Sequence, residues 1–183
     1  MTSKFPLSQK YMDFINSVRG VSADFLEGTT ASGKTTVGAG IKFMRMVSAS
    51  RKKLHVIAAK TTGKAEETII QQDNGILDLH TNARYFGNGD KDYKLPHIKF
   101  EGKIIYVLGY DNKDKWEMVL GAQFGCVYID EINTADIESV RCQPVTITLW
   151  RPSTLTTPLF LCIKNLSTAH VRIRNTPVTC LRR

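Results

Sequence analysis

The chain has 183 residues and a formal net charge of +8. This length favours one domain with a sizeable core, and no stretch is long and apolar enough to predict a membrane-spanning helix. Residues 142–183 hold six Lys or Arg and no Asp or Glu, so most of the excess charge lies there. The charge alone therefore does not identify a nucleic-acid-binding domain.

The N-terminus and the cysteines lead us to expect a soluble, intracellular chain. Met1 to Pro6 contain no apolar signal core. The four cysteines lack the spacing of a zinc site or a redox motif, so we expect reduced thiols.

The first expected element is a helix that begins after Ser8, a suitable N-cap, and ends near Gly20. Gln9 has two interpretations. In several P-loop motor families a glutamine at this place binds the adenine edge, but a lone Gln at a helix start is more often solvated. One face of this helix is apolar and predicts core packing through Tyr11, Phe14, Ile15 and Val18.

The most informative stretch follows a short strand-like run at 24–27 and precedes a helical pattern at 36–49. It reads G-x-x-x-x-G-K-T, a phosphate-binding P-loop whose N–H groups converge on a nucleotide phosphate. Lys34 is expected to reach the β- and γ-phosphates, and the Thr35 hydroxyl to bind Mg²⁺. The alternative is a glycine-rich turn that binds nothing. The expected nucleotide-binding residues are Gly28, Thr29, Thr30, Ala31, Ser32, Gly33, Lys34, Thr35 and Thr36, with Gln9 as the adenine candidate.

The middle of the chain predicts ordinary α/β elements. Residues 54–59 read as a buried strand, 61–72 as a helix, and 73–96 as a loop with one short helix. Residues 97–100 and 103–108 flank Glu101-Gly102 and predict a hairpin, and 111–120 look helical. Three basic residues of this region can contact a phosphate backbone, although a solvated face is the more ordinary interpretation: Arg84, Lys91 and Lys94.

Residues 126–131 form a second motif, an apolar run that ends in Asp130 and Glu131. This pattern is typical of a Walker B strand, which brings Asp130 beside the P-loop to support Mg²⁺. Glu131 is then placed to act as the catalytic base toward water. The alternative is a buried strand with an acidic turn, but the upstream P-loop favours the functional interpretation.

Residues from about Phe5 to Glu138 resemble the N-terminal ATPase domain of the large subunit of tailed-phage terminases. The resemblance rests on the runs FLEGT at 25–29, the P-loop, AAKTT at 58–62, GNGDK at 87–91, GAQF at 121–124 and YIDEI at 128–132. It implies ATP- and Mg²⁺-dependent packaging of double-stranded phage DNA into procapsids, with a small subunit and a portal protein as partners. It also implies a homo-oligomer in the full-length protein and the cytoplasm of a bacterial host, from a phage or prophage gene.

Two features depart from that family. The loop interior, Thr29 to Ser32, lacks the arginine that many terminases carry there, so an arginine finger must come from elsewhere. After Walker B, the Thr/Asn-rich coupling motif is not recognisable from about Ser139 onward. Nothing matches the family's C-terminal nuclease domain, which we expect to be absent.

The segment 142–183 is acid-free and proline-dotted, and we interpret it as an out-of-frame tail. Possible codons for Leu149 to Pro158, regrouped from the last base of the first codon, can encode M-A-T-L-N-P-D-D-P, as expected of the coupling-motif region. We hypothesise that a small deletion near Ser139 shifted the frame and truncated the protein. The tail is then expected not to pack.

The expected fold is a three-layer α/β P-loop NTPase with a mainly parallel sheet, truncated after the Walker B strand. The expected domain is 1–141, and its expected function is ATP hydrolysis that drives DNA packaging. A truncated remnant that at most binds nucleotide, or another DNA-dependent ATPase such as a helicase, are the alternatives.

Overall fold

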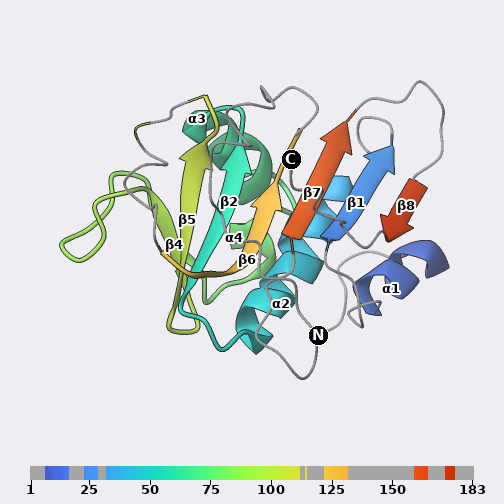
Figure 1. The fold of residues 1–183 in the computed structure, drawn as a ribbon, viewed down its shortest axis with the longest axis horizontal. Helices are drawn as coiled ribbons and strands as arrows, with labels where there is room; N and C mark the ends of the chain where they lie inside the picture. The colour runs from blue at the N-terminus through green and yellow to red at the C-terminus, as the bar shows by residue number, and fades with distance from the viewer. Residues whose placement is uncertain are drawn as a thin grey trace, which may run out of the picture.

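Eight strands of one sheet dominate the part of the chain that the structure describes (Figure 1). The structure is a computed structural model that describes residues 7–16, 23–28, 32–111, 114, 122–131, 159–164 and 172–175. The strand order is β3-β4-β5-β2-β6-β7-β1-β8, and the five strands from β5 to β1 run parallel. The strands are β1 (Ala23–Gly28), β2 (Leu54–Ala59), β3 (Arg84–Phe86), β4 (His97–Phe100), β5 (Lys103–Gly109), β6 (Phe124–Ile129), β7 (Leu159–Lys164) and β8 (Arg172–Asn175).

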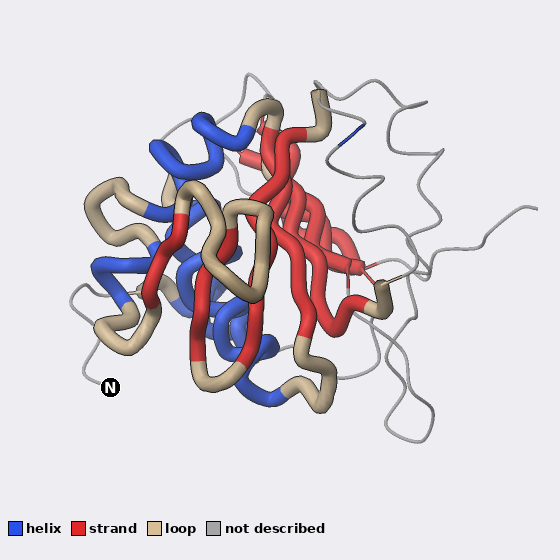
Figure 2. Tube along the Cα trace, turned by 90° about the vertical axis from the view of Figure 1, so that its left-hand side faces the viewer, coloured by secondary structure: helices blue, strands red, loops and turns tan. Residues whose placement is uncertain are grey.

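The helical segments lie on one side of this sheet (Figure 2). The predicted α/β fold class with a mainly parallel sheet is confirmed. None of the described helices has the length and apolarity that crossing a membrane requires. The segments are α1 (Gln9–Asn16), η1 (Thr36–Phe43), α2 (Met44–Ala49), α3 (Thr62–Ala65), η2 (Glu66–Ile70) and α4 (Ile76–Leu79), where η marks π-helical geometry.

Most local predictions are confirmed. The expected strands at 24–27, 54–59 and 126–129 form within β1, β2 and β6. The hairpin of β4 and β5 turns through Glu101 (φ 48°) and Gly102 (φ 72°), two positive φ angles as in a type I′ turn. The predicted helix at 36–49 forms, but its first part is π-helical. β3 lies within the predicted loop, and the helix predicted at 111–120 falls mostly outside the described residues.

The expectation that the sheet stops after the strand carrying Asp130 is wrong. β7 pairs in parallel with both β6 and β1, and β8 pairs antiparallel with the other edge of β1. These two segments therefore pair with the sheet, whereas 142–183 was expected to form no part of it. The physical reason is the run Leu159 to Ile163, five apolar residues in succession, as a strand inside a parallel sheet requires.

The helix that follows the P-loop sequence packs very closely on the sheet. A Cβ at Gly38 would lie 2.8 Å from Leu26 Cδ1 and 3.3 Å from Tyr128 Cε2. Leu26 is 1% exposed and Tyr128 is fully buried, with its ring 6.0 Å from that of Phe43. The missing side chain at Gly38 lets η1 approach β1 and β6 together, which fixes the P-loop helix over the two strands that carry the motifs.

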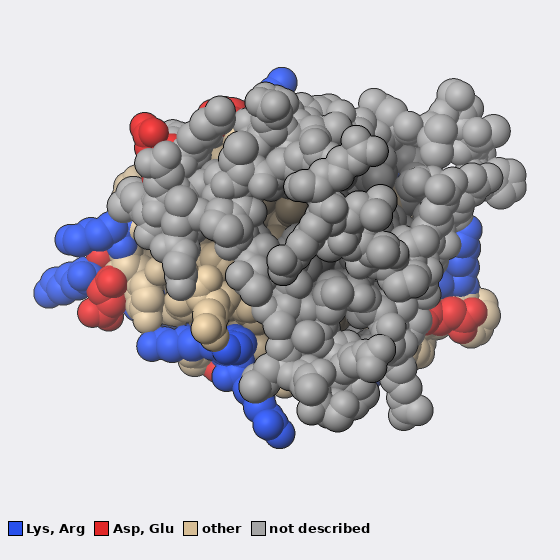
Figure 3. Space-filling view, viewed as in Figure 1, with Lys and Arg blue, Asp and Glu red and all other residues tan. Residues whose placement is uncertain are grey.

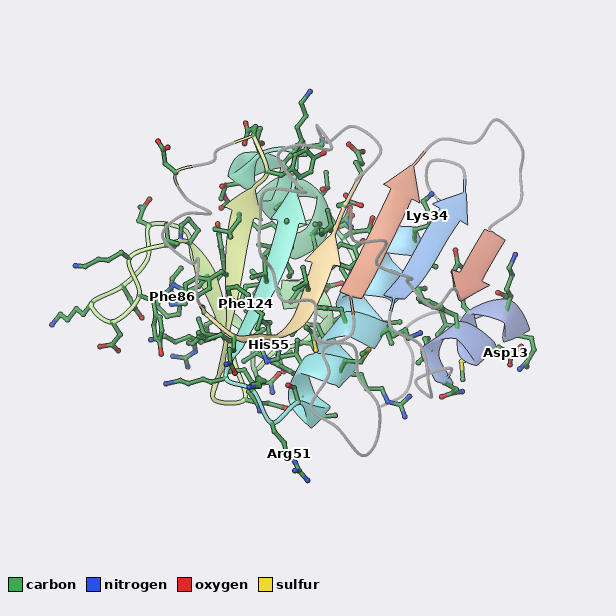
Figure 4. All side chains as sticks on the ribbon, viewed as in Figure 1. Asp13, Lys34, Arg51, His55, Phe86 and Phe124 are labelled. Atoms are coloured by element: carbon green, nitrogen blue, oxygen red, sulfur yellow. The ribbon has the colours of Figure 1, made fainter. Side chains whose placement is uncertain are left out.

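A buried histidine, His55, lies at an irregularity in the sheet, at the amino-terminal end of the parallel strands (Figure 4). The β2–β6 register shifts between Leu54 and Val56. There, His55 Nδ1 accepts the Cys126 backbone N–H at 3.0 Å, and His55 Nε2 lies 3.1 Å from the Lys52 carbonyl oxygen. His55 is therefore neutral with its proton on Nε2. Burial, with a smaller contribution from the charge of Lys103, lowers the pKa of His55 to about 4, although the Lys52 hydrogen bond opposes this.

Stability is expected to fall as the pH falls from about 6.5 to about 4. The unfolded chain protonates His55 near 6.5, whereas the folded chain resists protonation until about 4, so the unfolded state binds more protons in this window. The resulting loss approaches about 3 kcal/mol below pH 4. Urea unfolding at pH 7, 5.5 and 4 measures it.

His55→Ala is the control for this pH dependence. It should be less stable at pH 7 by about 1–3 kcal/mol, because the Cys126 N–H loses its acceptor. It should also lose most of the slope between pH 6.5 and 4. An unchanged slope in this variant would show that other groups cause the pH dependence.

Candidate functional site

The two sequence motifs meet at the carboxyl edge of the parallel strands. Phe25 of β1 and Ile129 of β6 both lie opposite Leu161 of β7. β1 and β6 therefore lie on either side of β7 with residues 25 and 129 at the same level, and the two strands are about 10 Å apart. Gly28 ends β1 and Asp130 follows β6, so both motifs lie at this edge. Figure 4 shows Lys34 there, near the upper ends of β7 and β1.

Lys34 lies almost wholly inside the protein. Its side chain is 3% exposed, and its Nζ donates to Ser32 Oγ at 3.0 Å. Gly33 has φ 81°, a left-handed conformation that favours glycine. The Val37 N–H donates to the Gly33 carbonyl at 2.9 Å, so the helix begins directly after this glycine. A charged amine at a helix start, with N–H groups that lack helical acceptors, is suited to an anionic ligand.

Asp130 and Glu131 occupy the turn after β6. Asp130 is 1% exposed, and its N–H donates to the Ala58 carbonyl at 2.8 Å, which continues the ladder to β2. Side-chain alternation places Asp130 on the same sheet face as Tyr128, the face that carries η1. Glu131 is half-buried with φ 51°, which is rare for a residue with a Cβ. The Tyr110 hydroxyl donates to the Glu131 carbonyl at 3.2 Å and stabilises this turn.

The residues of this edge suit a Mg²⁺–nucleotide. A buried carboxylate such as Asp130 requires a cation or hydrogen-bond donors around it, and hard cations prefer oxygen ligands. Thr35 is half-buried next to Lys34 and supplies a hydroxyl. Within the described residues there is no group of three or more His, Cys, Asp or Glu that could hold a metal. A magnesium ion here would therefore depend on phosphate oxygens and water as well as on Thr35 and Asp130.

The structure reaches part of the predicted loop only. Gly28, Ser32, Gly33, Lys34, Thr35 and Thr36 are described, whereas Thr29, Thr30 and Ala31 lie outside the described residues. Gln9 is exposed on α1, and its amide donates to Asp13 Oδ1 at 2.7 Å. The adenine role of Gln9 stays a prediction.

One contact with the loop was not predictable from the sequence. The hydroxyl of Tyr11, on α1, donates to the carbonyl oxygen of Ser32. The apolar pattern of α1 placed Tyr11 on the packing face, but a hydroxyl that contacts a main-chain carbonyl leaves no pattern in the sequence.

The GNGDK run at 87–91, one of the terminase-like motifs, has a structural role here. Asp90 Oδ1 accepts the N–H groups of Asp92 and Tyr93 at 2.9 and 2.7 Å, and its other oxygen forms an ion pair with Lys99. The hydrogen bond from Lys99 lowers the pKa of Asp90 to about 2. Asp90 Oδ2 also lies 3.5 Å from Nε2 of His97, a buried ring stacked on Phe86. This motif therefore anchors the loop before β4.

The basic residues of this region are solvated. Arg84, Lys91 and Lys94 are exposed, as the more ordinary interpretation predicts. Figure 3 shows Lys and Arg side chains projecting from the described surface with acidic ones beside them. No separate anion site is indicated by them.

The fold and the motif edge together define the class: a mixed α/β P-loop NTPase fold with a parallel core. Large terminase from a thermophilic bacteriophage is similar to this chain, with TM-score 0.64 and 19% identity over 87% of this chain and 39% of that chain. The complex of the same terminase with ADP matches with TM-score 0.59 and 20% identity over 86% and 39%. Its complex with ATP-gamma-S matches with TM-score 0.55 and 18% identity over 86% and 38%.

These similarities show the fold: the chain has the fold of the large-terminase region that it matches. This chain covers at most 39% of the length of each terminase chain above. No model of a known protein family matches the chain, and no curated protein matches it either.

Proposed function

We propose that this chain binds and hydrolyses ATP as the ATPase part of a phage large terminase. The observation that carries the proposal is the meeting of two motifs at one sheet edge. Lys34, 3% exposed, and Asp130, 1% exposed, follow parallel strands separated by one strand. A buried ammonium suits the phosphate oxygens of a nucleotide, and a buried carboxylate suits its Mg²⁺. The likeness to a terminase with ADP and ATP-gamma-S complexes supports the same conclusion.

Each residue then has a defined task. The loop from Gly28 to Thr36 binds the phosphates through its N–H groups, and Lys34 binds the β- and γ-phosphate oxygens. Thr35 and Asp130 hold Mg²⁺, which supplies charge neutralisation to the phosphates when it is bound. Glu131 accepts a proton from the attacking water, and Gln9 contacts the adenine.

The fold likeness supports a proposal for the biological process. We propose that hydrolysis drives double-stranded phage DNA into a procapsid, with a terminase small subunit and a portal protein as partners. The acting form is an oligomer of the full-length protein in the host cytoplasm. We also propose that residues after about Ser139 are translated out of frame. Sequencing the encoding DNA tests the last point, because an intact terminase frame must continue downstream.

Glu131→Gln tests the proposed chemistry. The purified chain should release phosphate from ATP, and this variant should lower the rate by about 10²–10⁴-fold, since a general base contributes about that much. Affinity for MgATP should change less than about threefold, because the glutamine keeps the size of the side chain. Phosphate release and titration with a fluorescent ATP analogue measure the two effects.

Two outcomes would contradict the proposal. If the wild-type chain binds no MgATP, the proposed nucleotide site does not exist. Wild-type chain that binds MgATP but hydrolyses it no faster than Glu131→Gln would leave a binding module without the proposed catalysis. The melting temperature without nucleotide serves as the control that both proteins are equally folded.

A further inference from the structure

The orientation of one peptide group in the P-loop is fixed from outside the loop. The Ser32 carbonyl accepts a hydrogen bond from the Tyr11 hydroxyl of α1. In a planar trans peptide the C=O and the following N–H point in opposite directions. The Gly33 N–H therefore points away from Tyr11. The Ser32 side chain meanwhile accepts from Lys34 Nζ at 3.0 Å.

This peptide group can reverse at little cost. Gly33 has φ 81° and no Cβ, so both orientations of the peptide before it are accessible. A phosphate site needs convergent N–H donors. A reversed Ser32–Gly33 peptide would present a carbonyl oxygen to the anion in place of a donor, which is repulsive. A contact that holds the carbonyl in one direction thus selects the binding-competent loop.

Tyr11 is well placed to hold it, because α1 is fixed along the P-loop helix. Lys42 of η1 is 1% exposed, and its Nζ lies 3.9 Å from the centre of the Phe14 ring on α1. Arg45 donates to Asn16 Oδ1 at 3.2 Å at the end of α1. A Cβ at Gly33 would lie 3.9 Å from the Tyr11 hydroxyl. The contacts of Phe14 and Asn16, together with the hydrogen bond from Tyr11 to Ser32, therefore hold α1 in register with the loop and the helix behind it.

We propose that Tyr11 is a positioning residue that holds the Ser32–Gly33 peptide with its N–H directed into the phosphate site. This proposal rests on the proposed nucleotide function. It assigns α1 to the phosphate side of the site through Tyr11, separately from the adenine role proposed for Gln9. The roles of Tyr11 and Gln9 can be separated, because they predict different effects on ligands that contain an adenine and on ligands that do not.

The experiment compares Mg-ADP with Mg-tripolyphosphate, which has no base. Tyr11→Phe keeps the ring and removes the hydroxyl, and it should weaken both ligands equally, by about three- to tenfold for one hydrogen bond. Gln9→Ala should weaken Mg-ADP alone. Tyr85→Phe, on the edge strand β3, is the matched loss of a hydroxyl and should change neither affinity. Isothermal titration calorimetry gives each Kd, and the melting temperature of free Tyr11→Phe should match the wild type.

The outcomes separate this proposal from the function on which it rests. Wild-type chain that binds neither ligand overturns both. Wild-type chain that binds both, with Tyr11→Phe binding them equally well, overturns only the role of Tyr11. A Tyr11→Phe loss confined to Mg-ADP also overturns it, because the effect would then act on the base. A lower melting temperature of free Tyr11→Phe with unchanged affinities would reduce Tyr11 to a packing residue.

Discussion

Lys34→Ala is expected to weaken MgATP binding by about 100-fold and to reduce hydrolysis to background. Lys34 is 3% exposed, so water screens its charge little. Hydrogen bonds from such a charge to phosphate oxygens contribute about 1.5–3 kcal/mol each, and about 1.4 kcal/mol is tenfold in affinity. Fluorescent-nucleotide titration and phosphate release measure both losses.

The free variant should remain folded. Removing a buried charge relieves a desolvation cost, and the Ser32 hydroxyl that accepts from Lys34 can bond to water instead. The melting temperature without nucleotide should therefore not fall, while the rise produced by MgATP in the wild type should disappear.

Lys64→Ala is the matched control. Lys64 lies on α3, where its side chain is 44% exposed and pairs with Glu67 at 3.0 Å. An exposed pair of this kind contributes little, so binding and hydrolysis should stay within about twofold of the wild type. If Lys34→Ala bound MgATP as tightly as this control, Lys34 would not contact the phosphates.

Local patterns predicted the elements that depend on near neighbours in the chain. The strand, loop and helix around Lys34 are contiguous, and the β4–β5 hairpin needs only the turn at Glu101-Gly102. The π-helical geometry of η1 was not predictable, because spacing at about 3.6 residues does not distinguish it from an α-helix. β3 was missed since three residues, Arg84–Phe86, give too short a pattern.

Pairing between distant segments of the chain explains why β7 and β8 were not predicted. Nothing in the neighbourhood of residues 159–164 indicates that they lie between β1 and β6, and the composition of 142–183 favoured an unpacked tail. The same limit applies to the site. Lys34 and Asp130 were recognisable from motifs, whereas Tyr11 and Tyr110 act through main-chain carbonyls and carry no motif.

Leu161→Pro is expected to destabilise the whole sheet, because β7 alone connects the P-loop strand to the strand before Asp130 among the described residues. Leu161 lies opposite Phe25 on one side and Ile129 on the other. Proline removes its N–H and is not accommodated inside a sheet. The lost hydrogen bond and the acceptor left without a donor cost about 2–4 kcal/mol, a large share of a total of about 5–15 kcal/mol. Urea unfolding measures the loss.

Nucleotide binding should fail together with stability in this variant, because β7 lies between the strand that ends at Gly28 and the strand that precedes Asp130. Leu161→Val is the control: it keeps the N–H and suits a strand, so it should unfold within about 1.5 kcal/mol of the wild type. A Leu161→Pro chain as stable as the wild type would mean that residues 159–164 do not form a central strand in solution. The ATPase core would then have to assemble from residues 1–141 without them.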